Sequence, residues 1–312
     1  MAKVALAIHG GAGTISRQRM TPALEAEYRS GLEKALKAGW DVLHRDGSSM
    51  DAVEAAVSWL EDFPLFNAGR GSVFTHEGRV EMDAAIMDGR TREAGAVASV
   101  CNIQNPIQLA RLVMERTGHV LLAGDGANQF AQQCGVKLQP DEYFFTEHRW
   151  RQLIDARNAD RVQLDHSEGL EAPAAASLGT VGAVACDSHG HLAAATSTGG
   201  MTNKKFGRIG DTPLIGAGTY ADGTCAVSGT GHGEYFMRGV TAFDVAARMK
   251  HGGVSLAHAA QASVDVLTEL QGEGGLIAVD TDGNVALPFN SEGMYRGFVT
   301  GHGKMNVEIY GD

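Results

Sequence analysis

The sequence predicts a layered α+β fold, with helices on the faces of mainly antiparallel sheets. Apolar runs of strand length and runs of helical periodicity both occur in each half of the chain. The strands come in clusters, and so do the helices, which is typical of this class and not of a strictly alternating parallel sheet. With 312 residues, 44% of them hydrophobic, the chain can bury a large core.

The first elements are a buried strand and two amphipathic helices. Residues 4–8 form an apolar run that ends at a glycine cluster. Apolar residues then recur every fourth position over 22–44, which predicts a helix. Ser48, with Asp51 three positions later, resembles a capping box, so a second helix is expected to begin there and to end before Pro64.

Shorter strands and helices follow in the first half. Strand-like runs broken by the turn sequences Glu77-Gly78 and Asp88-Gly89 occupy 72–100. A further strand is predicted at 120–123. Helices are predicted near 106–116, 127–133 and 147–156.

The second half repeats one hairpin pattern. Strands are predicted at 181–186 and 192–197, and again at 277–280 and 285–287. Both pairs carry the sequence Asp-x-x-Gly-x-[Leu/Val]-Ala, so we expect two hairpins of like geometry. Two helices, over 234–250 and 255–270, are predicted between them.

Charge and composition exclude several classes of protein. A formal net charge of −11 argues against nucleic-acid binding and against anionic membrane surfaces. No apolar run reaches the length of a membrane span, and the N-terminus does not resemble a signal peptide, so a soluble cytoplasmic protein is expected. The four cysteines show no C-x-x-C pair, which argues against a zinc cage or a redox pair; they are Cys101, Cys134, Cys186 and Cys225. They could form two disulfides, but reduced and mostly buried thiols are expected, because a chain of this size does not need disulfides.

The segment before Thr180 is unusual. Residues 158–177 are charged or small and lack periodicity, so an exposed loop is expected there. A threonine hydroxyl needs a neighbouring base to act as a nucleophile. Cleavage between Gly179 and Thr180 would supply one, because an α-amine has a pKa of about 7.7–8.0. The simpler interpretation is a threonine that opens a strand after a linker.

Further polar clusters each allow two interpretations. Arg208 and Asp211, three positions apart between glycines, could form a local salt bridge, or could bind the α-carboxylate and α-ammonium of a zwitterion. The glycine turn over 228–234 suits an oxyanion hole or a phosphate. Residues 195–204 are rich in hydroxyls, which is also typical of a turn. The segments around His9 and Asn67 are weak signals singly.

Taken in order, these segments resemble the plant-type asparaginase / isoaspartyl peptidase family, and its bacterial isoaspartyl peptidase branch most of all. The resemblance covers nearly the whole chain. It rests on the segments HGGAG, LFNAGRGS, GTVGAVACD, TSTGGMTNK, GRIGDTPLIGAG, SGTGHGE and PFNSEGMYRG.

The resemblance implies a fold and an assembly. The chain would form one domain over 1–312, the four-layer αββα sandwich of N-terminal nucleophile hydrolases. The precursor would cut itself into an α subunit, 1–179, and a β subunit, 180–312, with 158–179 as a flexible linker. Two such pairs would assemble into an (αβ)₂ heterotetramer.

The resemblance also implies residue roles. Thr180 would attack the amide carbonyl of L-asparagine or of a β-aspartyl dipeptide and release L-aspartate from an acyl-enzyme. Thr198 would support it, and Thr230 with the N–H of Gly231 would form the oxyanion hole. Substrate would be bound by Asn67, Arg208, Ile209, Gly210, Asp211, Thr230, Gly231, His232 and Gly233.

No cofactor is implied for catalysis, but a structural Na⁺ is. Its ligands would be main-chain carbonyls of a loop, namely those of Leu60, Glu61, Phe63, Phe66, Ala68 and Arg70. Arg70 does not exclude the ion, because main-chain ligation makes few demands on side chains. His232 and Thr219 depart from the family pattern.

Other classes of protein fit the sequence less well. A serine esterase would use Ser255 in a near match to G-x-S-x-G, but Ser255 lies between two helical patterns. A glycosylasparaginase usually carries a signal peptide. An inactive relative or a small-molecule binding protein would require loss of Thr180, Arg208 or Asp211. A metal hydrolase lacks its usual histidine spacing. The preference between asparagine and isoaspartyl dipeptides stays open.

Overall fold

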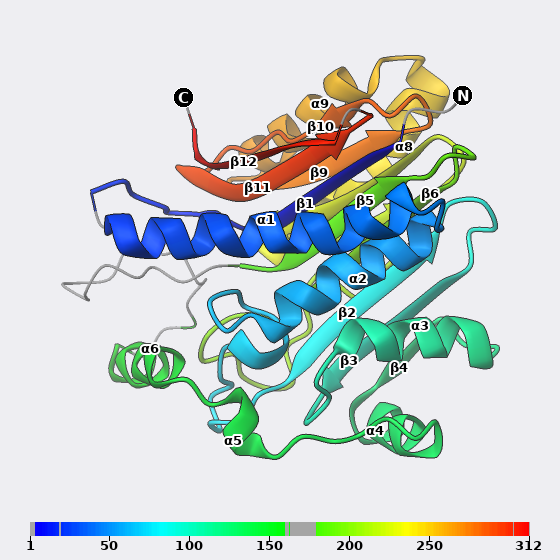
Figure 1. Ribbon diagram of the computed structural model, residues 1–312. Coiled ribbons are helices and arrows are strands. Elements are labelled where there is room, and N and C mark those ends of the chain that lie inside the picture. Colours follow the sequence, from blue (N-terminus) through cyan, green and yellow to red (C-terminus); the bar gives the residue numbers. More distant parts are fainter. Residues whose placement is uncertain (1–3, 19, 160–161, 163–178, 302, 312) are drawn as a thin grey trace.

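The computed structural model describes residues 4–18, 20–159, 162, 179–301 and 303–311. These residues form two β-sheets with helices on their outer faces (Figure 1). The prediction of a mixed fold of helices and mainly antiparallel sheets is confirmed, because β3 and β4 make the single parallel pairing among the described strands. Most of the linker predicted at 158–179 falls outside the described residues.

The larger sheet has eight described strands in the order β12-β11-β1-β5-β6-β2-β3-β4. Strands distant in sequence therefore become neighbours, and β1 lies between β11 and β5. The bounds are β1 Ala5–Gly13, β2 Met82–Asp88, β3 Ala94–Val100, β4 Leu121–Ala123, β5 Val181–Cys186, β6 Leu192–Thr198, β11 Gly293–Thr300 and β12 Lys304–Tyr310.

The smaller sheet has the order β10-β9-β8-β7 and packs against the larger one. Its bounds are β7 Thr219–Ala221, β8 Cys225–Gly231, β9 Gly274–Asp280 and β10 Val285–Ala286. The predicted pair of like hairpins is confirmed, since β5–β6 and β9–β10 are both antiparallel and both turn through an Asp-x-x-Gly sequence.

Helices cover both outer faces. The larger sheet is covered by α1 Pro22–His44, α2 Ser49–Asp62 and α3 Pro106–Arg116, and the smaller sheet by α8 Thr241–Gly252 and α9 Leu256–Glu269 (Figure 1). Local sequence explains where α1 and α2 begin, because the side chains of Thr21 and Ser48 accept hydrogen bonds from the first turn. The remaining elements are η1 Gly69–Gly71, α4 Gly124–Gln133, α5 Asp141–Phe144, α6 Glu147–Asn158 and α7 Gly233–Gly239.

The side chains of β1 show how the layers pack. Leu6 and Ile8 belong to the core under the helices, whereas Ala5 and Ala7 face the second core, which contains the smaller sheet. Alternation along a strand places successive side chains on opposite faces. Small side chains on the inner face bring the two sheets close together, so polar groups of one sheet can reach the other.

One predicted helix is wrong in detail. Residues 234–250 form two helices, because Val240 has a left-handed conformation with φ 47° and separates α7 from α8. The N–H groups of Ala242 and Phe243 in the first turn of α8 bond to the carbonyls of Ala217 and Gly216. This tertiary contact fixes the start of α8 and is invisible to periodicity.

Two further sequence expectations concern the thiols and membrane spans. All four cysteines are free, with Cys186 and Cys225 buried and the other two half-buried. Among the described residues, no helix combines the length and the apolar character that a membrane crossing requires.

A pair of helix glycines tests the packing. Gly39 lies in α1 where it approaches α2, and a Cβ there would lie 2.8 Å from the carbonyl oxygen of Ala52. Gly126 in α4 has no atom within 4 Å of its virtual Cβ. We expect Gly39→Ala to lower the melting temperature, because overpacking costs about 1–3 kcal/mol and outweighs the helix propensity of alanine.

The matched substitution Gly126→Ala should raise the melting temperature, since alanine favours a helix over glycine by up to about 1 kcal/mol. Thermal unfolding of both variants checks the pair. Equal shifts in the same direction would contradict this account of the α1–α2 contact.

Candidate active site

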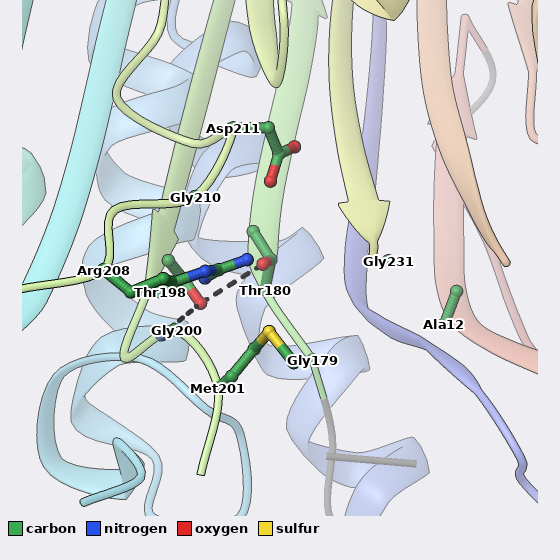
Figure 2. Close-up of a pocket in the computed structure, with 10 residues that line it drawn as sticks. All are labelled: Ala12, Gly179, Thr180, Thr198, Gly200, Met201, Arg208, Gly210, Asp211 and Gly231. Carbon is green, nitrogen blue, oxygen red and sulfur yellow. Dashed lines mark hydrogen bonds between the residues drawn. The ribbon is translucent and has the colours of Figure 1, made fainter. Parts of the chain in front are cut away.

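Thr180 stands immediately before β5 and is buried, with 7% of its surface exposed. The antiparallel register pairs Val181 with Ser197, which brings Thr180 beside Thr198 at the end of β6. The hydroxyl of Thr180 donates to Oγ1 of Thr198 over 3.2 Å (Figure 2). Thr198 also accepts from the N–H of Gly200 at 3.0 Å. Thr198 is therefore held as an acceptor that orients the Thr180 hydroxyl.

These hydroxyls open into a pocket where ends of both sheets meet (Figure 2). The sequence predicted Thr180, Thr198, Arg208, Gly210, Asp211 and Gly231 as site residues, and the structure brings all of them to this pocket. The pocket is lined by Ala12, Gly179, Thr180, Thr198, Gly200, Met201, Arg208, Gly210, Asp211 and Gly231.

A chain of hydrogen bonds holds the carbonyl of Thr180. The distances are 2.6 Å from Thr219 to Thr196, 2.7 Å from Thr196 to Ser228, 2.9 Å from Ser228 to Nε2 of His9, and 2.9 Å from Nδ1 of His9 to the Thr180 oxygen. The chain crosses between the sheets, because Thr219 and Ser228 belong to the smaller sheet and the others to the larger.

The direction of this chain follows from its last member. A carbonyl oxygen only accepts, so Nδ1 of His9 carries the proton. Burial lowers the pKa of His9 to about 3, and the hydrogen bond to Thr180 offsets only part of that effect. The ring is therefore neutral, and its Nε2 accepts from Ser228. Ser228 in turn accepts from Thr196, and Thr196 accepts from Thr219.

Two glycines allow the backbone to approach this network. A Cβ on Gly182 would lie 2.0 Å from Oγ of Ser228 and 2.5 Å from Nε2 of His9. Gly11 has φ +118°, and a Cβ there would lie 2.4 Å from the nitrogen of Gly179. Side chains at these positions would displace the residues on either side of Thr180, so the glycines of the HGGAG and GTVGAVACD segments have a steric explanation.

Arg208 forms a two-pronged salt bridge with Glu234, in the first turn of α7. Both contacts, Nε to Oε1 and Nη2 to Oε2, are 2.9 Å long. The sequence had suggested Asp211 as a local partner for Arg208, but the structure supplies a carboxylate 26 residues away. Burial raises the pKa of Glu234, but the Arg208 guanidinium lowers it more strongly, so this pKa lies below its ordinary value.

Asp211 is buried beside this pair, and its Oδ2 has no hydrogen-bond partner among the described residues. Burial raises the pKa of Asp211 to about 7, although the charge of Arg208 acts in the opposite direction. Gly233 stands between the two charges, since a Cβ there would lie 2.7 Å from Oδ1 of Asp211 and 2.9 Å from Nη2 of Arg208. The pocket thus presents a cation and an unsatisfied carboxyl at close range.

Thr230 and Gly231 end β8 beside the pocket. The hydroxyl of Thr230 is fully buried and has no hydrogen-bond partner among the described residues. Gly231 has φ +147°, and a Cβ there would lie 2.4 Å from the carbonyl oxygen of Glu273. An unpaired buried hydroxyl is costly, so it calls for a partner such as a water molecule or a ligand group. Thr230 itself is not among the residues that line the pocket.

His232 caps α7 and is partly exposed. Its ring contacts Tyr235 at a centroid distance of 4.7 Å, and Nε2 lies 3.4 Å from Oε2 of Glu234. Burial lowers the pKa of His232, while the charge of Glu234 raises it in part. His232 therefore contacts the carboxylate that holds Arg208, and its expected contact with substrate stays a prediction.

Asn67 is buried, and the structure places it behind the pocket lining. Its Nδ2 donates to the carbonyl of Gly200 at 2.8 Å, and its Oδ1 accepts from the N–H of Val73. It thereby positions the turn that carries Gly200. Ile209 is half-buried and is not among the lining residues. Direct substrate contacts of these two residues stay predictions.

The loop expected to hold Na⁺ joins α2 to η1. A Cβ on Gly69 would lie 2.4 Å from the carbonyl oxygen of Glu61, and one on Gly71 would lie 2.1 Å from that of Phe66. The loop is therefore tightly wound. Four of the six carbonyls expected as ligands accept backbone N–H groups within it, namely those of Leu60, Phe63, Phe66 and Ala68. The guanidinium of Arg70 lies over the ring of Tyr143 at 5.4 Å. Each carbonyl oxygen keeps a second lone pair, and oxygen ligands suit a hard cation, so Na⁺ binding by this loop stays a prediction.

Glu61 connects this loop to the pocket. Its buried Oε1 accepts from Oγ of Ser197, at 2.6 Å, and from the N–H of Ile107, at 3.0 Å. Ser197 immediately precedes Thr198, so the loop is linked to the strand end that orients Thr180. Burial raises the pKa of Glu61 to about 8, although these hydrogen bonds lower it in part.

Sequence reasoning assigned no role to Glu234 or to the hydrogen-bond chain. Glu234 closes the segment SGTGHGE, and His9 opens HGGAG, so the motifs contained both residues. No local signal pairs Glu234 with Arg208, or His9 with Ser228 across 219 positions.

Ser255, the candidate of the esterase alternative, caps α9. Its side chain accepts from the N–H of His258 at 3.5 Å, and the residue is exposed. It begins a helix after an exposed turn and does not sit on a strand-to-helix elbow, so the structure disfavours a serine nucleophile there.

Comparisons with known proteins agree with this arrangement. A family model described as Asparaginase matches residues 2–309. The isoaspartyl peptidase of Salmonella typhimurium is 52% identical over 298 residues, which are 95% of each chain. The isoaspartyl peptidase of Escherichia coli is 51% identical over 95% of this chain and 92% of its own. The plant-type L-asparaginase of Pyrococcus abyssi is 42% identical, over 95% and 96%.

The buried imidazole predicts a pH dependence of stability. In the folded protein His9 stays neutral down to about pH 3, whereas in the unfolded chain it binds a proton below about pH 6.5. The unfolded state therefore binds more protons in this window, and stability falls as the pH drops from 6.5. The slope is about 1.4 kcal/mol per pH unit inside the window.

His9→Gln should unfold at a lower temperature at pH 7.5, because the hydrogen-bond chain is cut, but its melting temperature should fall less between pH 7.5 and 5. His251→Gln, at an exposed site on α8, is the matched control and should follow the unaltered protein. An equal pH slope in His9→Gln would remove His9 as the source of the effect.

Proposed function

Because the chain belongs to the asparaginase family, we propose that it is a threonine amidohydrolase that cleaves isoaspartyl dipeptides and L-asparagine and releases L-aspartate. The relatives named above are isoaspartyl peptidases and L-asparaginases, which are hydrolases. The observation that carries the proposal is the Thr180 hydroxyl, bonded to Thr198, in one pocket with Arg208 and Asp211.

The pocket charges suit a β-aspartyl substrate. Arg208 offers a planar guanidinium for the α-carboxylate. Asp211, when ionised, offers a carboxylate for the α-ammonium. Their close approach around Gly233 matches the short distance between these two groups on one α-carbon. The amide carbonyl of the substrate side chain would then extend toward Thr180.

We propose that Thr180 is activated by cleavage of the bond that precedes it. Its Oγ1 attacks the carbonyl carbon of Gly179, the peptide C–N bond breaks, and the nitrogen of Thr180 takes the proton. Water then hydrolyses the resulting ester, which frees the hydroxyl and leaves an α-amine beside it. This amine is the base that the threonine hydroxyl otherwise lacks.

The same atoms then act on substrate. Oγ1 of Thr180 attacks the substrate carbonyl carbon and passes its proton to the α-amine. The oxyanion accepts hydrogen bonds from the Thr230 hydroxyl and the N–H of Gly231. The C–N bond of the substrate breaks as the leaving nitrogen takes that proton, and an acyl-enzyme remains. Water, deprotonated by the same amine, releases L-aspartate.

The unpaired hydroxyl of Thr230 supports this assignment. It is buried without a partner among the described residues, so it is free to donate to an oxygen that arrives with substrate. The hydrogen bonds to the Thr180 carbonyl and hydroxyl support the role of that residue as a held nucleophile.

Fold and assembly belong to the same proposal. The order helices, larger sheet, smaller sheet, helices supports the four-layer αββα sandwich of N-terminal nucleophile hydrolases. We assign residues 1–179 and 180–312 to the α and β subunits of one cleaved domain. We further propose that two such pairs form an (αβ)₂ heterotetramer.

The proposal includes a structural Na⁺. The carbonyls of the α2–η1 loop would hold it, from Leu60, Glu61, Phe63, Phe66, Ala68 and Arg70. When bound, the ion supplies a positive charge that stabilises this wound loop. Glu61 transmits the position of the loop to Ser197 and so to Thr198.

Cleavage at Thr180 is tested directly by substitution. Thr180→Ala should remain one uncut chain and should not hydrolyse a β-aspartyl dipeptide, because attacking oxygen and catalytic hydroxyl are the same atom. The unaltered protein should yield two fragments, the second with the N-terminal sequence Thr-Val-Gly-Ala, by mass spectrometry or Edman sequencing. Thr180→Ser retains the hydroxyl and should still be cut. Full turnover by an uncut chain would falsify the mechanism.

Substrate binding is tested at Arg208. Hydrogen bonds to charged groups contribute about 1.5–3 kcal/mol, so Arg208→Ala should raise KM for β-aspartyl dipeptides roughly 10- to 100-fold. Glu234→Gln keeps Arg208 but weakens its anchor, and should raise KM less. Arg248→Ala, which breaks a similar salt bridge on α8, is the control. Steady-state kinetics in which all three variants behaved alike would remove Arg208 from the site.

A further inference from the structure

The turn between β5 and β6 gathers two histidines and an aspartate. It lies at the far end of β5 from Thr180, about 20 Å away by the rise of a strand. Ligating atoms of Asp187, His189 and His191 all lie within 4.8 Å of one another. Among the described residues, no other group of three or more histidine, cysteine or acidic side chains brings its ligand atoms this close together. The proposed function uses none of the three.

Asp187 is fixed before any ion arrives. Its side chain is 3% exposed. Its Oδ1 accepts from the N–H groups of His189 and His191, each at 3.0 Å, and its Oδ2 accepts from the N–H of Ser49 at 3.2 Å. These bonds hold the carboxylate in one orientation, and Oδ2 keeps a lone pair for a further partner.

The histidines project into solvent on the same side of the turn. Their rings are nearly parallel, at 16°, with centroids 5.7 Å apart. Nδ1 of His191 lies 3.7 Å from Oδ2 of Asp187. Two ligands of one tetrahedral ion with bonds of about 2.1 Å lie about 3.4 Å apart, so this pair is close to coordination distance. Rotation of the exposed His189 ring can close the remaining gap.

The second hairpin shows that the turn does not need histidines. Asp280 accepts from the N–H groups of Asp282 and Asn284 at 3.0 and 2.9 Å, as Asp187 does from residues two and four positions later. The backbone bonds across the two turns are also equivalent. Imidazoles at 189 and 191 are therefore an addition to a turn that forms without them.

The surroundings favour a cation. Oγ of Ser188 donates to Asp46, which brings a second carboxylate to the turn. The adjacent second turn contributes more negative charge. Sγ of Cys186 donates to the carbonyl of Thr281 at 3.8 Å, which places the second turn, with Asp280 and Asp282, beside the first.

We propose that Asp187, His189 and His191 bind a divalent transition-metal ion of the zinc type. Two imidazoles and one carboxylate are the donors that Zn²⁺, Co²⁺ and Ni²⁺ prefer, whereas Ca²⁺ and Mg²⁺ prefer oxygen alone. Since Asp187 also bonds to Ser49 at the start of α2, the bound ion ties the β5–β6 turn to the α1–α2 corner. The site is independent of the proposed amidohydrolase activity.

The test is a Zn²⁺ titration of the full-length, untagged protein after removal of metal by a chelator. Calorimetry, or competition with a fluorescent zinc indicator, should give one site per chain. Co²⁺ in its place should produce visible absorption bands from nitrogen and oxygen ligation. His189→Asn and His191→Asn should each weaken Zn²⁺ binding at least ten-fold.

Two controls keep the test sharp. The double variant His189→Asp/His191→Asn gives the first turn the residues that the second turn has at these positions, so it should fold without metal and lose the site. His251→Asn removes an exposed histidine elsewhere and should bind like the unaltered protein. Circular dichroism and melting temperature without metal establish that each variant is folded. Unchanged Zn²⁺ affinity in the folded double variant would overturn the proposal.

The reverse substitution adds a gain-of-site test. Asp282→His/Asn284→His places two imidazoles on the equivalent turn at Asp280 and should raise the stoichiometry from one to two Zn²⁺ per chain. A stoichiometry that stays at one, in a folded variant, would count against the assignment of ligands to these turn positions.

Discussion

The hydrogen-bond chain that ends at the carbonyl of Thr180 is the constraint on which the candidate site depends. It has one possible direction, because the carbonyl accepts and burial keeps the His9 ring neutral. Each side chain in the hydrogen-bond chain donates to the next group, so these buried polar groups between the two sheets are all paired and cost little to desolvate. The hydrogen-bond chain also requires glycine beside it, because a Cβ on Gly182 would lie 2.0 Å from Oγ of Ser228. The hydrogen bond from His9 thereby holds the carbonyl of Thr180, while the Thr180 hydroxyl donates to Thr198.

The charges in the pocket follow a different logic. Arg208 is paired with a partly exposed carboxylate, Glu234, so its position is fixed in the absence of any ligand. Asp211 is buried without such a partner, and its pKa is raised to about 7 as a result. A site that leaves one carboxyl unsatisfied beside a fixed guanidinium complements a ligand that carries both signs of charge. This complementarity is the physical reason that the proposed substrates are zwitterions.

Much of the fold could be read from local pattern. Periodicity placed α1 and α3 at their observed bounds, and the repeated Asp-x-x-Gly sequence correctly predicted two hairpins of like geometry. The family resemblance, drawn from motifs in fixed order, was confirmed by the family match over residues 2–309. Local pattern failed at Val240, where contacts with the 216–217 carbonyls end one helix and begin another. It also missed Glu234, because a salt bridge across 26 positions leaves no periodic trace.

The residue order alone was enough to identify the family, the nucleophile candidate and the charged pair, because those signals reside in short contiguous segments. The partner of each residue was decided only when the chain folded. His9 meets Ser228, Asn67 meets Gly200 and Glu61 meets Ser197 because the strand order of the larger sheet and the packing of the two sheets bring remote segments together. The environments that shift the pKa values of His9 and Asp211 arise from the same packing, since burial in the assembled layers, and not the neighbouring sequence, removes water from these groups.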